Sequence, residues 1–197
     1  MIPIPYELVA ARIVFGALLV IYVVVEGGIR IASQRNAEGA PARERVSYGV
    51  LIVVLLGSMA AALFLARSGD FAIPVGRWAF FAVGVVLMAL GIALRVWAVV
   101  VLGRAFTVEV RVRAGQEVVD RGPYRVVRHP SYTGLLLVFL GTGLALGDWL
   151  ALIVVVVPPI AAIAFRIRIE EEALLAGLGD AYRRYSAGRK RLVPGIW

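Results

Sequence analysis

Five long apolar runs constrain this chain more than any other feature of its sequence. A helix needs about 20 mostly apolar residues to cross the hydrocarbon core of a bilayer. The runs lack the period-two alternation of membrane strands, so they predict α-helices rather than a β-barrel. The predicted spans are residues 8–31, 48–66, 78–102, 132–146 and 149–165. Only Gly147 and Asp148 separate the last two spans, which predicts a tight antiparallel hairpin.

The 197-residue chain is 61% hydrophobic, so we predict a single all-α integral membrane domain over residues 1–197. It has no cysteine, which excludes disulfides, thiolate metal sites and a cysteine nucleophile. His129 is its one histidine, so a site of several histidines is excluded, and we predict no metal. The net charge of +8 would suggest nucleic acid in a soluble protein. Here the basic residues flank apolar spans, which is typical of contact with anionic membrane lipid, and we predict no nucleic acid partner.

Basic residues are distributed unevenly between the predicted loops. Residues 30–45 contain four, 104–128 six and 166–191 seven, whereas residues 67–77 contain two and the 147–148 turn none. Cytoplasmic loops are enriched in Lys and Arg. Five spans place all three rich segments on one side, so we predict an external N-terminus, with the C-terminus and the active site in the cytoplasm. Residues 103–134 and 166–197 are predicted to form the cofactor-binding part there, a small cap built from the 103–129 loop and the C-terminal helix.

The stretch GPYRVVRHPSYTG, residues 122–134, places the one histidine among arginines and tyrosines. Pro130 suits the first turn of a helix, where its missing N–H costs nothing, and it pushes His129 towards an extended conformation. The motif is therefore predicted to lie where a loop becomes the fourth span, at the membrane surface. Two interpretations are open: an interfacial anchor in which His129 caps the helix, or a ligand-binding site.

Two further clusters follow the fifth span. Residues 170–172 are three consecutive glutamates, which either form a solvated stripe or hold the hydroxyls or ammonium of a ligand. Arg168 precedes the second and third of them by three and four residues, so it shares their helix face. In the tail, Tyr182 and Tyr185 lie three apart on a predicted amphipathic helix, which is also what an interfacial helix would show.

Arg95 interrupts the third span. A charge inside a membrane helix is costly, and it usually pairs with another group or faces a polar cavity. Glu26 of the first span is the candidate partner, and snorkelling of the arginine to the interface is the alternative. Pro158 and Pro159 predict a kink in the fifth span.

Taken in order, these residues resemble the isoprenylcysteine carboxyl methyltransferase family in its prokaryotic type. The family pattern Gly-x-Tyr-Arg-x-x-Arg-His-Pro-x-Tyr-x-Gly is matched by residues 122–134. After the hairpin, the family's paired Glu, Leu, Gly, Tyr-x-x-Tyr and Pro-Gly are matched by Glu171, Glu172, Leu175, Gly179, Tyr182, Tyr185, Pro194 and Gly195. Leu178 departs from the pattern, because the family usually has Phe before this Gly.

The resemblance implies a membrane enzyme, in a prokaryotic plasma membrane, that uses S-adenosylmethionine and releases S-adenosylhomocysteine. Its acceptor would be a lipophilic small molecule: an isoprenylcysteine-type carboxylate or another lipid-borne O, S or N nucleophile. The cofactor-binding residues that it implies are Gln116, Val118, Val119, Gly122, Tyr124, Arg128, His129, Tyr132, Glu171, Glu172 and Tyr182. The expected catalytic residues are Arg168, Glu171 and Tyr132, with Arg168 holding an acceptor carboxylate in a fork. Such a transfer needs alignment and a partly desolvated acceptor rather than a metal or a covalent protein nucleophile.

Two alternatives are open. One is a membrane NADPH-dependent reductase related to sterol reductases, which share a similar histidine and acidic pair but bind a nicotinamide cofactor. The other is a non-catalytic membrane assembly factor, which would bind no nucleotide-type ligand.

Overall fold

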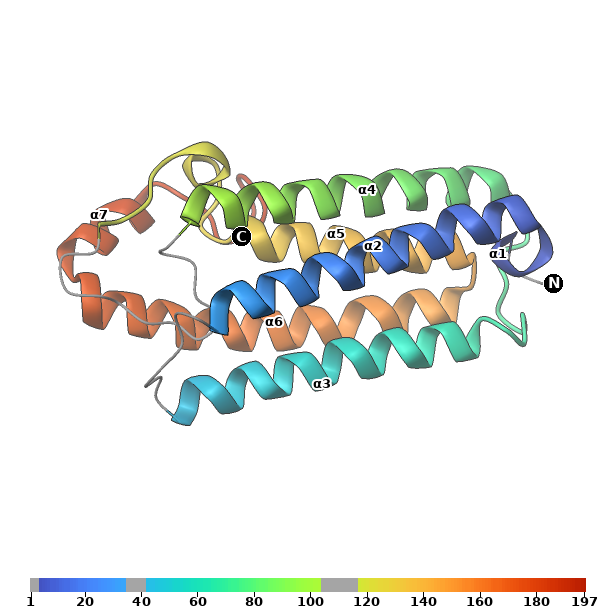
Figure 1. Cartoon of the computed structure of the whole chain (residues 1–197), viewed down its shortest axis with the longest axis horizontal. Coiled ribbons are helices and arrows are strands. Elements are labelled where there is room, and N and C mark those ends of the chain that lie inside the picture. Colours follow the sequence, from blue (N-terminus) through green and yellow to red (C-terminus); the bar gives the residue numbers. More distant parts are fainter. Residues whose placement is uncertain (1–3, 35–41, 104–116) are drawn as a thin grey trace.

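The computed structural model describes residues 4–34, 42–103 and 117–197. Within these ranges the chain forms helices and no strand. In chain order the elements are α1 (Ile4–Glu7), α2 (Val9–Gln34), α3 (Ala42–Leu65), α4 (Arg77–Leu102), the 3-10 helix η2 (Gly122–Arg125), α5 (Pro130–Leu146), α6 (Trp149–Leu178) and α7 (Asp180–Ala187). The five long helices run alongside one another, and η2 and α7 lie together at one end of the bundle (Figure 1).

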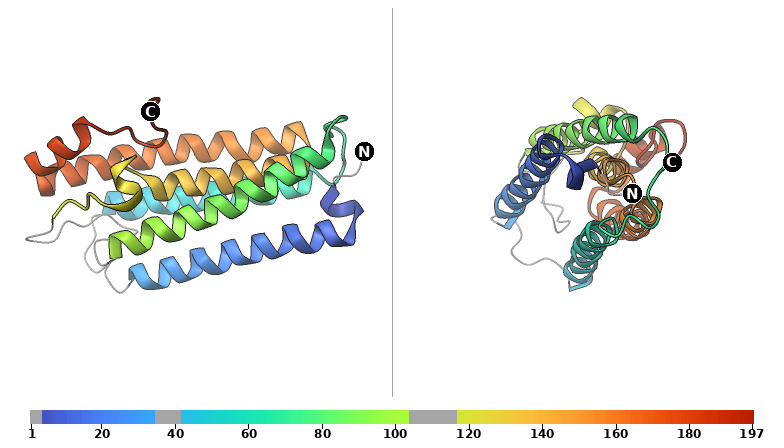
Figure 2. Two further views of the ribbon diagram at one scale, coloured as in Figure 1. Left: turned by 90° about the horizontal axis from the view of Figure 1, so that it is seen from above. Right: turned by 90° about the vertical axis from the view of Figure 1, so that its right-hand side faces the viewer.

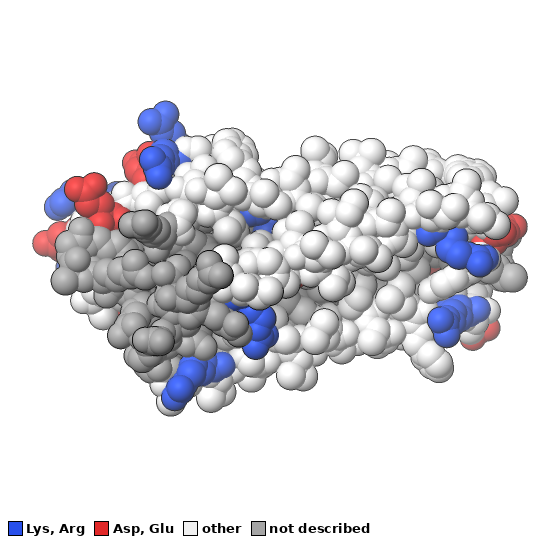
Figure 3. All heavy atoms as spheres, in the orientation of Figure 1, with Lys and Arg blue, Asp and Glu red and all other residues white. Residues whose placement is uncertain are grey.

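The long helices have the dimensions of membrane spans. Helices α2, α3, α4 and α6 are long and apolar enough to cross a bilayer, and α5 is a shorter apolar helix of 17 residues. At 1.5 Å per residue α5 spans about 25 Å, close to the roughly 30 Å of a hydrocarbon core. On the face shown in Figure 3, charged side chains gather towards the two ends and the surface between is almost uncharged. The predicted all-α integral membrane fold with five helices is confirmed.

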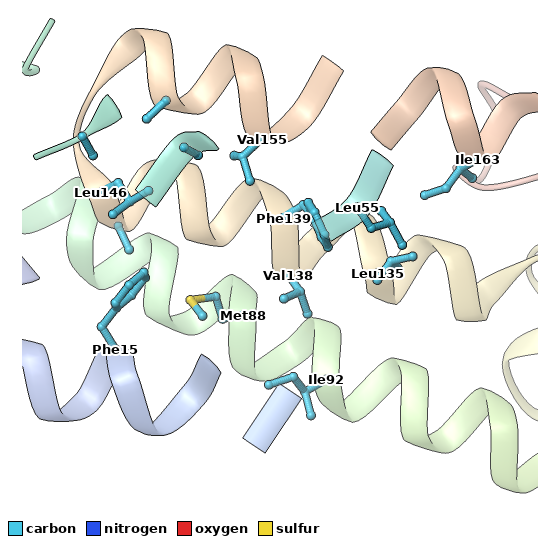
Figure 4. Close-up of a cluster of buried hydrophobic side chains, with 14 of the residues drawn as sticks. Phe15, Leu55, Met88, Ile92, Leu135, Val138, Phe139, Leu146, Val155 and Ile163 are labelled. Atoms are coloured by element: carbon cyan, nitrogen blue, oxygen red, sulfur yellow. The ribbon is translucent and has the colours of Figure 1, made fainter. Parts of the chain in front are cut away.

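Helix α5 lies at the centre of the bundle, and the end-on view in Figure 2 shows the other long helices around it. It is buried on most sides, as expected for a helix that is apolar all round. Its Leu135, Val138 and Phe139 belong to one buried cluster with Met88 of α4 and Val155 of α6 (Figure 4). The helix that begins with the RHPSY motif is therefore held rigidly by the core.

Helices α4 and α5 approach each other closely through glycines. A Cβ atom added at Gly84 would lie 2.5 Å from the Gly141 carbonyl oxygen, and one added at Gly91 would lie 2.6 Å from the Gly134 carbonyl oxygen. The two glycines of each helix are seven residues apart, so they lie on one helix face. Small residues at such a face let two backbones approach closely, and van der Waals packing of this kind helps to drive helix association in membranes.

The predicted hairpin between the last two spans is confirmed. Gly147 has a φ of 62°, in the left-handed region that suits glycine, and it ends α5. Asp148 starts α6, because its side chain accepts a hydrogen bond of 2.9 Å from the Ala151 N–H. The Ile73 N–H donates to the Gly147 carbonyl oxygen at 2.8 Å, which ties the loop between α3 and α4 to this turn.

Helix α6 continues well beyond the predicted span of residues 149–165. It runs to Leu178 and is continuous through Pro158 and Pro159. Its last turns consist largely of Arg, Glu, Ala and Leu, which favour helix without any need for lipid. The helix thus leaves the apolar region and carries the three glutamates with it.

The C-terminal tail pairs with the segment that precedes α5. Val127 and Lys190 form a parallel bridge. The N–H groups of Arg128 and His129 donate to the carbonyl oxygens of Lys190 and Arg191, each at 2.9 Å. The tail therefore lies against the RHP motif, although some 60 residues separate the two in the sequence.

Candidate active site

A cavity lies between the long helices at the end of the bundle that carries η2 and α7. Its lining combines polar groups from the RHPSY motif and α6 with apolar groups from α2 and α3. The lining residues are Glu26, Ile29, Tyr48, Leu51, Ile52, Leu55, Arg95, Leu102, Glu117, Val118, Val119, Tyr124, Arg128, His129, Ser131, Tyr132, Leu135, Glu170, Leu174, Leu178, Tyr182 and Tyr185.

His129 stands at the entrance to helix α5. Pro130 is the first helical residue, and His129 precedes it with φ −126° and ψ 59°. This backbone is non-helical but does not reach the extended conformation predicted for a residue before proline. The imidazole is only 5% exposed. Its Nε2 lies 3.3 Å from Oε1 of Glu171, and its Nδ1 lies 3.9 Å from Oε1 of Glu170. Two carboxylates of α6 thus face the two ring nitrogens.

Glu171 is the centre of an ion-pair network. Its Oε1 lies 2.8 Å from Nη1 of Arg128, and its Oε2 accepts hydrogen bonds from Nε and Nη2 of Arg191 at 3.0 and 2.8 Å. The hydrogen bonds to the carboxylate raise the pKa of Arg191. One buried carboxylate therefore joins α6 both to the motif and to the tail, and it balances the charge around His129.

Glu170 faces the cavity together with Tyr132. The Tyr132 hydroxyl donates to Oε2 of Glu170 at 2.9 Å. The rings of Tyr132 and His129 lie 5.9 Å apart, tilted by 32°. This wall of the cavity presents an acidic group and an aromatic ring side by side, which suits a ligand that carries positive charge and hydroxyl donors.

Helix α7 contributes two tyrosines to the lining of the cavity, and one of them bonds to η2. The Tyr185 hydroxyl donates to the Tyr124 carbonyl oxygen at 2.9 Å, and burial raises its pKa to about 12. The Tyr182 hydroxyl is buried and has no hydrogen-bond partner among the described residues. Burial, and then the charge of Glu171, raise the pKa of Tyr182 as well. Both phenols stay protonated at neutral pH, and that of Tyr182 can still bond to a ligand.

Comparison with known proteins assigns the chain to a family. Residues 79–181 match the model of the family described as phospholipid methyltransferase, which covers just over half of the chain. The chain belongs to the phospholipid methyltransferase family. The match includes α5, α6 and almost all of α4, together with the RHPSY motif and the three glutamates.

Individual relatives agree with this assignment and with the predicted resemblance. Protein-S-isoprenylcysteine O-methyltransferase B of Arabidopsis thaliana is 32% identical over 122 residues, 61% of this chain and 60% of that protein. Protein-S-isoprenylcysteine O-methyltransferase of Schizosaccharomyces pombe is 33% identical over 111 residues, 55% of this chain and 46% of that protein. The uncharacterised protein YpbQ of Bacillus subtilis is 22% identical over 161 residues, 81% of this chain and 96% of that protein. The chain thus spans three fifths or less of the two named methyltransferases.

The structure of this family member brings most of the predicted site residues together. Those that line the cavity are Val118, Val119, Tyr124, Arg128, His129, Tyr132 and Tyr182. Glu171 lies behind His129 instead of lining the cavity, and Glu172 pairs with Arg43 at 2.8 Å, where both side chains are exposed. Gln116 lies outside the described residues.

Two other predicted residues lie off the cavity. Arg168 is exposed and is not a lining residue. Gly122 starts η2 with a φ of 57°, and an added Cβ would lie 3.0 Å from the Val101 side chain. Gly122 therefore serves the turn and the approach to α4 rather than the wall of the cavity.

Sequence reasoning did not single out the lining face of α6. Glu170, Leu174 and Leu178 recur every four residues, so they form one stripe along the helix, and all three line the cavity. The spacing of four residues in the sequence could have identified this lining face. Leu178, the departure from the family pattern, is therefore a change in the wall of the cavity.

The predicted pair of Arg95 and Glu26 is present. Nε and Nη2 of Arg95 donate to the two carboxylate oxygens of Glu26. Both residues line the cavity, so the arginine does not snorkel to the interface.

Proposed function

We propose that the protein is a membrane methyltransferase that binds S-adenosylmethionine at the α7 end of the cavity and methylates a lipophilic acceptor. Family membership supports the class of reaction. The observation that carries the proposal is a cavity whose lining includes both the RHPSY motif and the apolar side chains of α2 and α3. A charged, nucleoside-like donor and an apolar acceptor can meet in such a space.

The residues of the polar end suit this cofactor. Glu170 can accept hydrogen bonds from an amino group or from ribose hydroxyls. The buried Tyr182 hydroxyl, which has no partner among the described residues, can form a hydrogen bond with the cofactor. The ring of Tyr132 can lie against a sulfonium, which is attracted to aromatic faces and carboxylates. When bound, S-adenosylmethionine would supply an electrophilic methyl group.

The chain's own contribution is positioning. Arg191 and Arg128 hold Glu171, Glu171 holds His129, and Glu170 orients the Tyr132 hydroxyl. The core around α5 holds the helix that begins with this motif, and methyl transfer depends on such alignment. No group of three or more potential metal ligands occurs among the described residues.

We place the α7 end in the cytoplasm. The helix ends that border the three segments rich in Lys and Arg lie at this end, and those that border the poor segments lie at the opposite end. Basic residues at the α7 end would contact the anionic headgroups of the inner leaflet.

Thermal unfolding in detergent tests the cofactor. S-adenosylhomocysteine at 100 times its Kd should stabilise the protein by about 2.7 kcal/mol. His129→Ala should weaken that binding roughly ten- to a hundredfold, because it removes a buried group that bonds to charge. Stabilisation by NADPH alone would favour the reductase, and no response to either compound would favour the assembly factor.

A pair of variants on α6 tests which of Glu170 and Arg168 takes part in methyl transfer. We expect Glu170→Gln to lower methyl transfer at least tenfold, because Glu170 lines the cavity and binds Tyr132. Arg168→Ala should have a much smaller effect, since Arg168 is exposed. Label transferred from S-adenosylmethionine into a lipid extract measures both. A larger loss in the Arg168 variant would restore the catalytic role that the sequence suggested for it.

A further inference from the structure

The lining of the cavity also contains an ion pair between Glu26 and Arg95. Arg95 is 8% exposed and the Glu26 side chain 25%, and both lie on membrane-spanning helices. Ionised groups at such positions are costly, and where they face a cavity they point to a ligand. None of the cofactor-binding roles proposed above for the RHPSY motif and α6 involves this pair.

The hydrogen bonds of Arg95 already engage most of its N–H groups. Its Nε and Nη2 bond to Glu26, and its Nη1 donates to the carbonyl oxygen and Oγ of Ser131 at 3.2 and 2.7 Å. The guanidinium is thus neutralised and held between α2 and the first turn of α5. A carboxylate ligand would have to displace Glu26 to gain a fork of its own.

Glu26 has the opposite character. Each of its oxygens accepts one bond from Arg95, whereas a carboxylate offers about four acceptor sites. Its partly exposed side chain faces the cavity, so this part of the wall presents hydrogen-bond acceptors and no net charge. The complementary ligand group is a hydrogen-bond donor.

The surroundings of the pair suit an alkyl tail. Ile29 of α2 and Leu51, Ile52 and Leu55 of α3 line the same cavity. Among the long helices, α2 packs mainly on α4 and α3 packs mainly on α6, and α2 and α3 have little contact with each other. Figure 2 shows them on separate sides of α5. The apolar part of the lining therefore lies between two helices that both face lipid.

We infer that Glu26 and Arg95 form the headgroup subsite for the methyl acceptor, and that this acceptor is a lipid with an uncharged hydroxyl or amine donor rather than a carboxylate. Glu26 accepts the hydrogen bond from the headgroup. Arg95 is the positioning residue: it bonds to Glu26 and to Ser131, and so fixes the Glu26 carboxylate beside the first turn of α5. The inference rests on the proposed function and narrows its substrate class.

Four probes with one dodecyl tail test the headgroup: 4-dodecylphenol, 4-dodecylaniline, 4-dodecylbenzoate and dodecylbenzene. Binding is measured as the shift of the unfolding midpoint in nanodiscs, without any cofactor. The phenol or the aniline should bind more tightly than dodecylbenzene, and the benzoate should not. The two donor probes separate a hydroxyl from an amine acceptor. Benzoate binding equal to or tighter than that of both donors would overturn the inference.

Variants of the pair test the residues. Glu26→Gln should weaken phenol or aniline binding roughly ten- to a hundredfold, the range expected for a lost bond to a charged group. The double variant Glu26→Gln with Arg95→Met leaves no unpaired buried charge and should show the same loss in a folded protein. Unchanged binding in the double variant would contradict the assignment.

S-adenosylhomocysteine distinguishes a wrong headgroup subsite from a wrong proposed function. It should stabilise the wild type and the double variant alike, because the pair lies on α2 and α4, whereas Glu170 and Tyr182 lie on α6 and α7. If S-adenosylhomocysteine stabilises both proteins but the probes bind equally well to the wild type and the double variant, the headgroup subsite is wrong and the proposed function stands. If it does not stabilise the wild type, the proposed function is wrong, and the acceptor assignment falls with it.

Discussion

A Gly84→Ala variant should lose about 3 kcal/mol or more of its unfolding free energy, enough to deplete folded protein in detergent. The added Cβ would lie 2.5 Å from the Gly141 carbonyl oxygen and 2.6 Å from the Ala145 backbone nitrogen. Neither atom can rotate away as a side chain would, so α4 and α5 would have to separate. Overpacking of a core usually costs 1–3 kcal/mol, and a clash with rigid backbone lies at or above the top of that range.

Gly57→Ala in α3 is the matched control. Nothing lies within 4 Å of a Cβ at Gly57, and it also sits inside a long apolar helix. It should be neutral or stabilising by up to about 1 kcal/mol, the difference in helix propensity between the two residues. Thermal unfolding and the monodisperse fraction on gel filtration report both effects. Equal stability of the two variants would show that α4 and α5 are not packed backbone to backbone.

The gross architecture of the molecule is predictable because it follows from hydrophobicity. The five spans, the turn at Gly147 and Asp148, and the pairing of Arg95 with Glu26 all come from apolar length, turn chemistry and the cost of a buried charge. The apolar run ends near residue 165 although α6 continues to Leu178, because polarity marks where lipid ends rather than where the helix does.

The roles of the three glutamates were not predictable in the same way. Neighbouring residues on a helix differ by about 100° in direction, so Glu170, Glu171 and Glu172 face three different environments. One lines the cavity, one holds the motif and the tail together, and one is exposed. Which glutamate takes which role depends on how α6 is rotated about its axis, and packing against α3 and α5 decides that. The pairing of the tail with Arg128 and His129 uses backbone groups, which carry no sequence signature.

The second large effect is expected for Glu171→Gln, which should reduce S-adenosylhomocysteine binding and methyl transfer at least a hundredfold. The carboxylate is 9% exposed and faces Arg128, Arg191 and His129. Removing one partner from a buried ion pair typically costs 3–5 kcal/mol. Because the Arg191 side chain is 33% exposed, solvent compensates for part of that loss. The remainder still corresponds to a factor of about one hundred.

The loss should appear first in the tail. Arg191 is the charged link between Glu171 and residues 188–197. Without it, the tail keeps its backbone bonds to Arg128 and His129 and the more exposed pair of Arg189 with Asp120. We expect the variant to be cleaved by trypsin near its C-terminus faster than the wild type. Glu171→Asp should recover part of the binding, because it retains the charge with a shorter reach.

Glu172→Gln is the control one residue away. Glu172 pairs with Arg43, and both side chains are more than half exposed, so its loss should cost less than 1 kcal/mol. The two variants remove the same charge from the same helix turn, and only the structure distinguishes them. If Glu172→Gln impaired cofactor binding as much as Glu171→Gln, the cofactor role that the sequence suggested for Glu172 would hold. The buried network around His129 would then not be what organises the site.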